Sequence, residues 1–128
     1  MAIRIVIPGQ LPGLNEYIAA ERSSKYKAVK MKHEAERLIG YYVNLAAKGD
    51  KVAAPVMIHY TWIEPNKRRD KDNIAWAKKF LQDALVAAGI LADDGWKYIE
   101  GFTDSFAVDK HNPRIEIKIK EISDNKMH

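Results

Sequence analysis

The sequence predicts a single α/β (α+β) domain in which one small mixed sheet carries two main helices. Residues 2–8 and 114–120 alternate apolar and polar side chains, as half-buried strands do. Two stretches between them, about 25–47 and 72–88, carry apolar residues at helical spacing. With 128 residues, the chain can bury a core but has little room for a second domain. We therefore expect one domain over residues 1–122 and a flexible polar tail over 123–128.

Four segments have the pattern of strands. Residues 2–8 place three isoleucines on one side, and a turn-rich loop follows as far as Asn15. A strand near 56–62 has a bulky side made of Val56, Ile58, Tyr60 and Trp62. Residues 97–108 look extended, and the last strand turns Ile115, Ile117 and Ile119 inward. The order strand, helix, strand, helix, strand, strand favours helices packed on one sheet.

The two helices are delimited by glycines. The first ends at Gly49-Asp50, and we expect its apolar side to comprise Leu38, Tyr41, Tyr42 and Leu45. The second ends at Gly89, and its expected buried stripe comprises Ile74, Ala77, Leu81, Ala84, Leu85 and Ala88. The stretch from 15 to 32 is rich in lysine and arginine, with no element assigned before Lys25.

Composition excludes several classes of site. The chain has no cysteine, which rules out disulfides, thiolate metal sites and cysteine nucleophiles. Its four histidines have no spacing typical of zinc ligands. A net charge of +4 and a pI near 9.2 fit a polyanionic partner. No leader and no apolar run near ~18 residues is evident, so we expect a soluble intracellular protein.

Residues 67–73 combine cations with carboxylates. Lys67, Arg68 and Arg69 run directly into Asp70 and Asp72, and a second acidic pair follows at Asp93-Asp94. Carboxylate oxygens are hard ligands that suit Mg²⁺ or Mn²⁺, and we take Asp70, Asp72 and Asp94 as the candidate metal ligands. The cations beside them, with Lys25, Lys27 and Asn73, are candidates for binding DNA. This combination indicates phosphodiester chemistry on nucleic acid.

Helical geometry selects one lysine as the candidate that stabilises transition-state charge. If 72–88 is one continuous helix, Lys79 lies about 20° from Asp72 around the helix, and Asp83 lies about 20° away on the other side. Trp76 falls on the same polar-plus-aromatic face, whereas Lys78 falls about 120° away. Lys79 is therefore favoured over Lys78 for that role.

Structural readings of the same residues remain open. Asp72 or Asn73 can cap the second helix, and Asp93-Asp94-Gly95 can form a turn. Asp83 and the basic residues can be solvated, and Trp76 can serve packing or an interface. Two functional alternatives also stay open: a different metal-dependent nuclease of branched DNA, and a non-catalytic DNA-binding module.

The run Arg69-Asp70-Lys71-Asp72-Asn73, followed by Lys79, Asp83-Ala84-Leu85, Gly89 and Asp93-Asp94, resembles the RusA family of Holliday junction resolvases. The resemblance covers most of residues 2–121. One departure concerns the helix, which is about three residues longer here before Asp83. Counting forward from Asp72 therefore puts Trp76 in the lysine's place, whereas counting back from Asp83 gives Lys79.

The resemblance implies a homodimeric, Mg²⁺-dependent endonuclease that resolves four-way DNA junctions by paired nicks, in recombination and repair; Mn²⁺ is a possible substitute. It assigns the essential acids to Asp70, Asp72 and Asp94, the catalytic lysine to Lys79, and the basic residue before them to Arg69. The family is common in bacteria and their prophages, which implies a cytoplasmic protein. For the dimer interface we expect Trp76 and the apolar face of the second strand.

Overall fold

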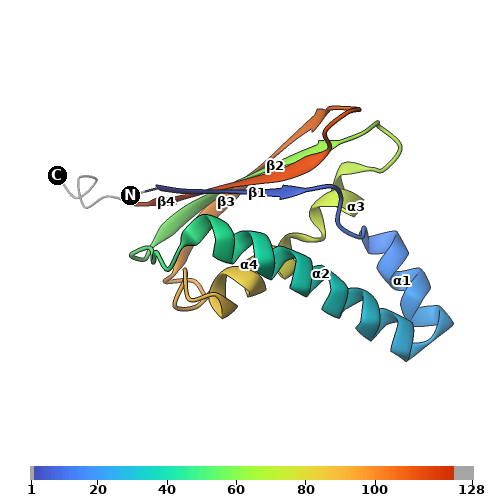
Figure 1. Cartoon of the computed structure of the whole chain (residues 1–128), viewed down its shortest axis with the longest axis horizontal. Coiled ribbons are helices and arrows are strands. Elements are labelled where there is room, and N and C mark those ends of the chain that lie inside the picture. Colours follow the sequence, from blue (N-terminus) through green and yellow to red (C-terminus); the bar gives the residue numbers. More distant parts are fainter. Residues whose placement is uncertain (1, 123–128) are drawn as a thin grey trace.

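The computed structural model describes residues 2–122, so the predicted tail 123–128 lies outside the described residues. The strands of the described residues are β1 (Ala2–Pro8), β2 (Val56–Glu64), β3 (Ile99–Val108) and β4 (Arg114–Glu121) (Figure 1). They form one sheet in the order β1-β4-β2-β3, in which only β2 and β3 are parallel. The helices are α1 (Leu14–Ser23), α2 (Lys25–Ala47), α3 (Lys71–Ala75) and α4 (Lys78–Ala87).

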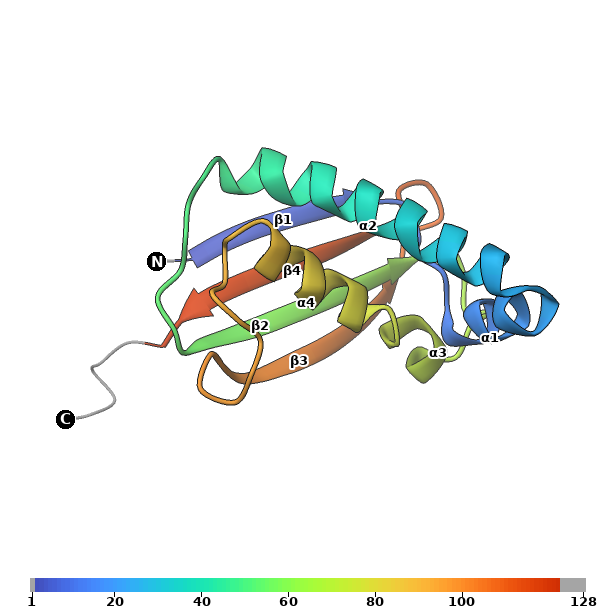
Figure 2. The same cartoon turned by 90° about the horizontal axis from the view of Figure 1, so that it is seen from below.

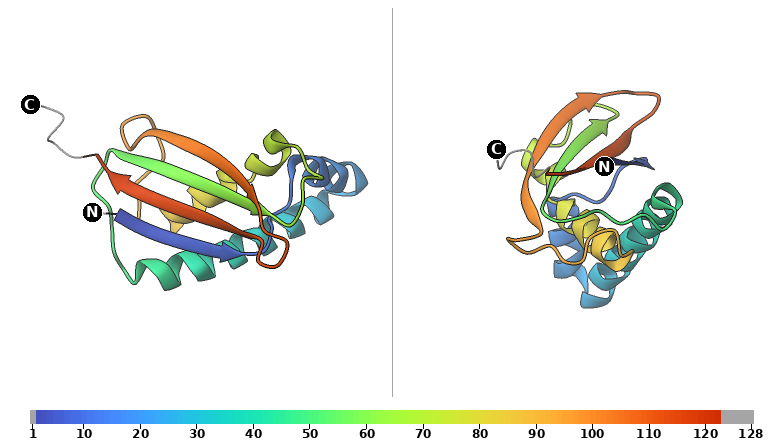
Figure 3. Two further views of the ribbon diagram at one scale, coloured as in Figure 1. Left: turned by 90° about the horizontal axis from the view of Figure 1, so that it is seen from above. Right: turned by 90° about the vertical axis from the view of Figure 1, so that its left-hand side faces the viewer.

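The predicted fold class is confirmed. Helices α2 and α4 cover one face of the sheet, while no described element covers the other face (Figures 2 and 3). The core lies between these layers and includes the alternate isoleucines of β1 and β4, with Ile5 paired to Ile117 across the two strands. The second strand also turns its bulky side inward, so that Tyr60 and Trp62 are buried. Helix α4 ends as expected, with Gly89 at a φ of +80° just beyond it.

The prediction for the core side of α2 is wrong. The buried residues of this helix are Ala28, Ala35, Ile39, Val43 and Ala47. Leu38, Tyr41 and Leu45 are exposed instead, and Tyr42 is only partly buried. Small side chains on the core side let the helix approach the sheet closely, which offsets their modest apolar area. A prediction that placed the largest apolar residues in the core therefore chose the wrong side of α2.

Helix α1 was not predicted, and its N-terminus depends on a distant residue. Its N-cap, Gly13, has no side chain that could accept a hydrogen bond. The side chain of Asn73 substitutes for it: Oδ1 accepts a hydrogen bond from the backbone N–H of Asn15 at 2.8 Å. The Glu16 carboxylate accepts another from the N–H of Gly13 at 3.2 Å. The cap of α1 is thus supplied by the second half of the chain.

The single helix expected over residues 72–88 is divided into α3 and α4 at Trp76 and Ala77. The N–H of Ala77 donates to the carbonyl of Ile74 and that of Phe80 to the carbonyl of Ala77, which is the tighter i to i+3 pattern. The Trp76 ring packs against Tyr17 of α1 and Phe80, with ring centroids 4.9 and 5.1 Å apart. Packing against α1 accompanies the break and interrupts the helical register used for the sequence prediction.

We expect Gly13→Ala to destabilise the fold. A Cβ at residue 13 would lie 2.7 Å from Oδ1 of Asn73, so the capping side chain would have to move. The expected loss is about 1–3 kcal/mol in the free energy of unfolding, measured by urea denaturation.

The matched control is Gly40→Ala within α2, where an added Cβ meets nothing within 4 Å. This change should stabilise the protein by about 0.5–1 kcal/mol, because alanine favours a helix interior. Equal effects of the two substitutions would contradict the role assigned to Asn73.

Candidate functional site

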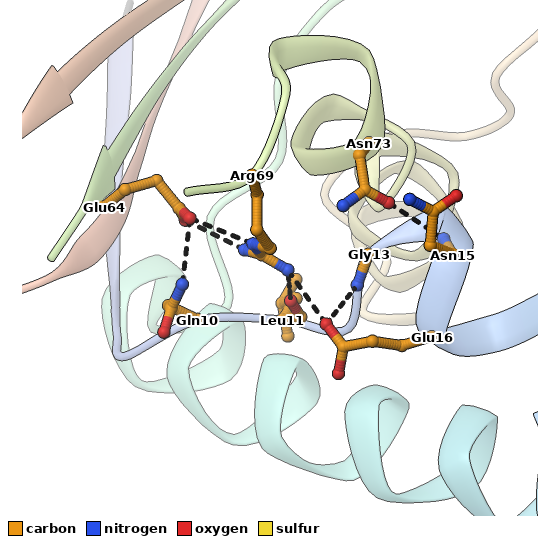
Figure 4. A network of polar contacts seen from close by, with 8 residues as sticks. All are labelled: Gln10, Leu11, Gly13, Asn15, Glu16, Glu64, Arg69 and Asn73. Carbon is orange, nitrogen blue, oxygen red and sulfur yellow. Dashed lines mark hydrogen bonds and ion pairs between the residues drawn. The ribbon is translucent and has the colours of Figure 1, made fainter. Parts of the chain in front are cut away.

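Arg69 connects the end of β2 to the N-terminal loop (Figure 4). Its Nε and Nη2 donate to the two carboxylate oxygens of Glu64 at 3.0 and 2.9 Å. Its Nη1 donates to the carbonyl oxygen of Leu11 at 3.0 Å and to Glu16 at 3.2 Å. Burial acts to lower the pKa of Arg69, but the hydrogen bonds and charges of Glu64 and Glu16 raise it overall. Arg69 is therefore a fixed cation within the protein.

Asn73 is also directed inward. It is buried, and its Oδ1 accepts the α1 capping bond from Asn15. Arg69 and Asn73 were both candidates for binding DNA, and the structure instead uses both side chains for internal contacts. The physical reason is that the loop before α1 would otherwise leave backbone donors and the Glu64 carboxylate unpaired.

Asp70 and Asp72 are directed the other way, into an open groove. Both are exposed, and both line a groove of about 840 Å³ between the start of α3 and the end of β3. Lys67 and Lys71 line the same groove, and Lys71 lies 5.6 Å from the centre of the Phe106 ring. Asp70 occupies the N-cap position of α3, but its side chain makes no capping bond. Asp72 and Asn73, for which a capping role in this helix was left open, lie inside α3.

Asp94 lies beside Lys79 on the loop between α4 and β3. The Lys79 ammonium is 3.4 Å from the Asp94 carboxylate and 3.1 Å from that of Asp83, one turn further along α4. Hydrogen bonding and charge from Asp83, followed by those from Asp94, raise the pKa of Lys79. The lysine is thus held as a cation at the solvent surface, next to one of the three candidate acids.

Lys78 is engaged elsewhere. Its ammonium donates to Asp104 at 2.5 Å and lies 4.0 Å from the centre of the Phe102 ring. Asp104 also accepts a hydrogen bond from the Trp62 indole at 2.9 Å. Because its side chain is only 16% exposed, Lys78 contributes to packing between α4 and the sheet. Of the two lysines, Lys79 is the one beside a candidate acid.

The three candidate acids do not gather around one point. Among residues 2–122, no group of three or more His, Cys, Asp or Glu side chains is placed to hold a single metal ion. Asp94 is not among the residues that line the groove of Asp70 and Asp72. The donor chemistry of these two nevertheless suits Mg²⁺, which proteins commonly hold by one or two carboxylates, with water and substrate phosphate completing the shell.

The remaining basic candidates are at the surface. Lys67 lines the groove, and Arg68 lines a neighbouring hollow beside Pro12 and Glu16. Lys25 and Lys27 are exposed at the start of α2, and neither lines the groove of Asp70 and Asp72. The start of α2 lies at the same end of the molecule as α3 (Figure 2).

Trp96 is a residue that the sequence prediction overlooked. It is fully exposed, two residues after Asp94 and next to Lys97. A fully exposed indole is unusual, because tryptophan offers a large apolar area. The sequence offered one indication that Trp96 is exposed, because its polar and glycine neighbours are typical of a turn at the surface. These neighbours are Asp93, Asp94, Gly95 and Lys97.

One of the two dimer surfaces expected from the sequence is buried in the protein. The apolar face of β2 is covered by the helical layer, and Trp76 packs between Tyr17 and Phe80. The prediction for the face of β2 is wrong, because its large apolar side chains are needed for the core, whereas Trp76 is only partly buried and its role in an interface stays a prediction. The expectation of a homodimer itself stays a prediction.

No protein-family model matches the chain, and no curated protein matches it either. Within residues 2–122, no helix has both the length and the apolar character required to cross a membrane.

Lys78→Ala and Lys79→Ala should separate stability from surface chemistry. Lys78→Ala should lower the free energy of unfolding by about 1–3 kcal/mol, because it leaves the Asp104 carboxylate without its cation. Lys79→Ala should change it by less than about 0.5 kcal/mol, since that ammonium is largely exposed. Thermal unfolding followed by circular dichroism measures both, and the opposite ranking would show that the two lysines are misassigned.

Proposed function

We propose that this protein is a divalent-metal-dependent endonuclease of branched DNA, acting as a homodimer on four-way junctions in the manner of the RusA family. The observation that carries the proposal is the arrangement of residues 69–73. Arg69 and Asn73 are anchored inside the protein, while Asp70 and Asp72 face an open groove that Lys67 and Lys71 also line. Such an enzyme would act on bacterial or phage DNA in the cytoplasm.

Asp70 and Asp72 would hold the ion at the groove. When bound, the ion would neutralise charge on the phosphodiester and lower the pKa of attacking water. The anchored residues on either side keep the carboxylates oriented, because Arg69 and Asn73 attach this segment to β2 and α1. Lys67 and Lys71 would attract the anionic DNA strand towards these acids.

Lys79 and Asp94 would act at the transition state. A lysine held as a cation can stabilise negative charge that grows on the phosphate oxygens. Asp83 and Asp94 hold that ammonium at 3.1 and 3.4 Å. The resemblance implies that Asp94 binds the metal, whereas its contact with Lys79 is consistent with positioning that lysine. Substitution can distinguish these two roles.

Substitution of the acids tests the activity. Asp70→Asn and Asp72→Asn should each reduce Mg²⁺-dependent nicking of a labelled junction by about 10²-fold or more, because each removes a charged ligand. Asp94→Asn should reduce nicking as well. If it binds the metal, raised Mg²⁺ or Mn²⁺ should partly restore the rate; if it positions Lys79, they should not.

Binding of the junction in Ca²⁺ should survive all three changes, since each removes negative charge near a polyanion. Asp50→Asn, at an exposed site beyond α2, is the matched control and should leave nicking unchanged. Absence of nicking by the unaltered protein on any branched DNA, with Mg²⁺ or Mn²⁺, would favour a non-catalytic binding module.

Binding measurements test how the junction is recognised. The candidate cations lie at the surface and offer phosphate contacts, so affinity should fall steeply with salt and depend little on sequence. Trp96→Ala should weaken junction binding by about 5- to 100-fold if the indole stacks on an unpaired base, while Trp96→Phe should keep most of the affinity. Neither change should affect binding to a linear duplex, and equal affinity for duplex and junction would contradict the resolvase proposal.

A further inference from the structure

Helix α2 carries an apolar stripe on the side that faces away from the core. Leu38, Tyr41 and Leu45 are 38%, 63% and 58% exposed, although each is a large apolar or aromatic residue. They are spaced by three and four residues, which is the repeat of a helix that packs against another helix. Their side of the helix is about 140° from the mean direction of the buried residues, by the rotation of an ideal helix.

No described element covers this stripe. Figures 1 and 3 show α2 at the outer edge of the helical layer, with the sheet and α4 on its other sides. Tyr41 contacts the ring of Tyr42, with centroids 5.0 Å apart, but this contact lies within the same helix. Apolar side chains that gather on one side of a long helix indicate a contact surface, whereas scattered ones do not.

Charged residues at the two ends of the stripe indicate what kind of surface it can bind. Glu34 and Lys48 each lie seven residues from Tyr41, one on each side, so both fall on the face of Tyr41 after two helical turns. Glu34 is exposed, and its ion pair with Lys30 is long, at 4.0 Å. Lys48 is also exposed, at the C-cap of α2. The stripe is therefore acidic at one end and basic at the other.

We propose that this stripe binds the same stripe of a second copy of the chain, with the two α2 helices antiparallel and Tyr41 next to the two-fold axis. In this arrangement Leu38 packs near Leu45 of the partner helix, and Glu34 meets Lys48 at both ends. A parallel arrangement would instead place Glu34 against Glu34. Self-complementary charge and apolar spacing together indicate an antiparallel pair.

Other basic residues of α2 do not oppose this arrangement. Arg37 lies four residues before Tyr41, at the level where the partner presents Leu45. Lys30 lies beyond the level at which the partner helix ends. No lysine or arginine of the helix therefore meets another at the same level across the axis. The proposal concerns assembly, and it does not depend on nuclease activity.

Charge reversal tests the pairing directly. Sedimentation at micromolar concentrations should give a dimer for the unaltered chain. Glu34→Lys and Lys48→Glu should each raise the dissociation constant by about 10-fold or more, because each places like charges together at both ends. The double variant should restore the affinity to within about threefold, since the same pairs form with exchanged signs.

A second variant and a control separate assembly from folding. Tyr41→Glu should give a monomer with an unchanged thermal midpoint at low protein concentration, because the side chain is exposed. Tyr26→Glu, at an exposed tyrosine near the start of α2 and beyond the level at which the partner helix ends, should leave the dimer intact. A monomer at all concentrations for the unaltered chain, or a double charge reversal that fails to restore association, would overturn the proposal.

Discussion

The buried ion pair between Arg69 and Glu64 holds together the parts of the chain that form the candidate site. Glu64 ends β2 and is only 7% exposed, so its charge requires a partner within the protein. Arg69 supplies two hydrogen bonds to it, and Gln10 supplies a third at 2.9 Å. Removing one partner of such a pair costs about 3–5 kcal/mol, because the other charge stays buried and unpaired. The N-terminal loop, β2 and the start of α3 therefore depend on one interaction.

This anchoring also explains why two carboxylates face the solvent. Arg69 is fixed before Asp70, and Asn73 is fixed after Asp72, so the backbone between them has little freedom to rotate. The inward side chains satisfy backbone donors and a buried acid, while the outward ones are left for the groove. The residues expected to bind DNA are thus separated into two groups. Arg69 and Asn73 support the site from within, whereas Lys67 lines its surface together with Lys71, which was not among those candidates.

The interruption at Trp76 and Ala77 separates the groove from the surface around Lys79. A continuous helix would have placed Asp72 and Lys79 along one face. The helix tightens where Trp76 packs between Tyr17 and Phe80, and α4 begins after this point. Lys78 is then used between α4 and the sheet, and Lys79 contacts Asp83 and Asp94 at the surface. The candidate site consequently has two parts, an acidic groove and a paired lysine.

Local pattern determined most of the fold from sequence alone. Three features that depend only on neighbours along the chain were predicted correctly. They are the alternating isoleucines of β1 and β4, the apolar repeat of α4, and the glycines that follow α2 and α4. Lys79 was favoured from its angle to Asp72 on a continuous helix; the structure divides that helix, and Lys79 lies beside Asp94 instead.

Tertiary structure decided the features that depend on distant contacts. The cap of α1 and the anchor of Arg69 on Leu11 each join residues 58 positions apart, and no local window contains both partners. Which side of α2 is buried depends on how closely the sheet approaches it, and this favoured alanine over leucine and tyrosine. Whether a polar side chain faces DNA or the protein depends on which buried charges and backbone donors need a partner, and only the folded chain brings these together.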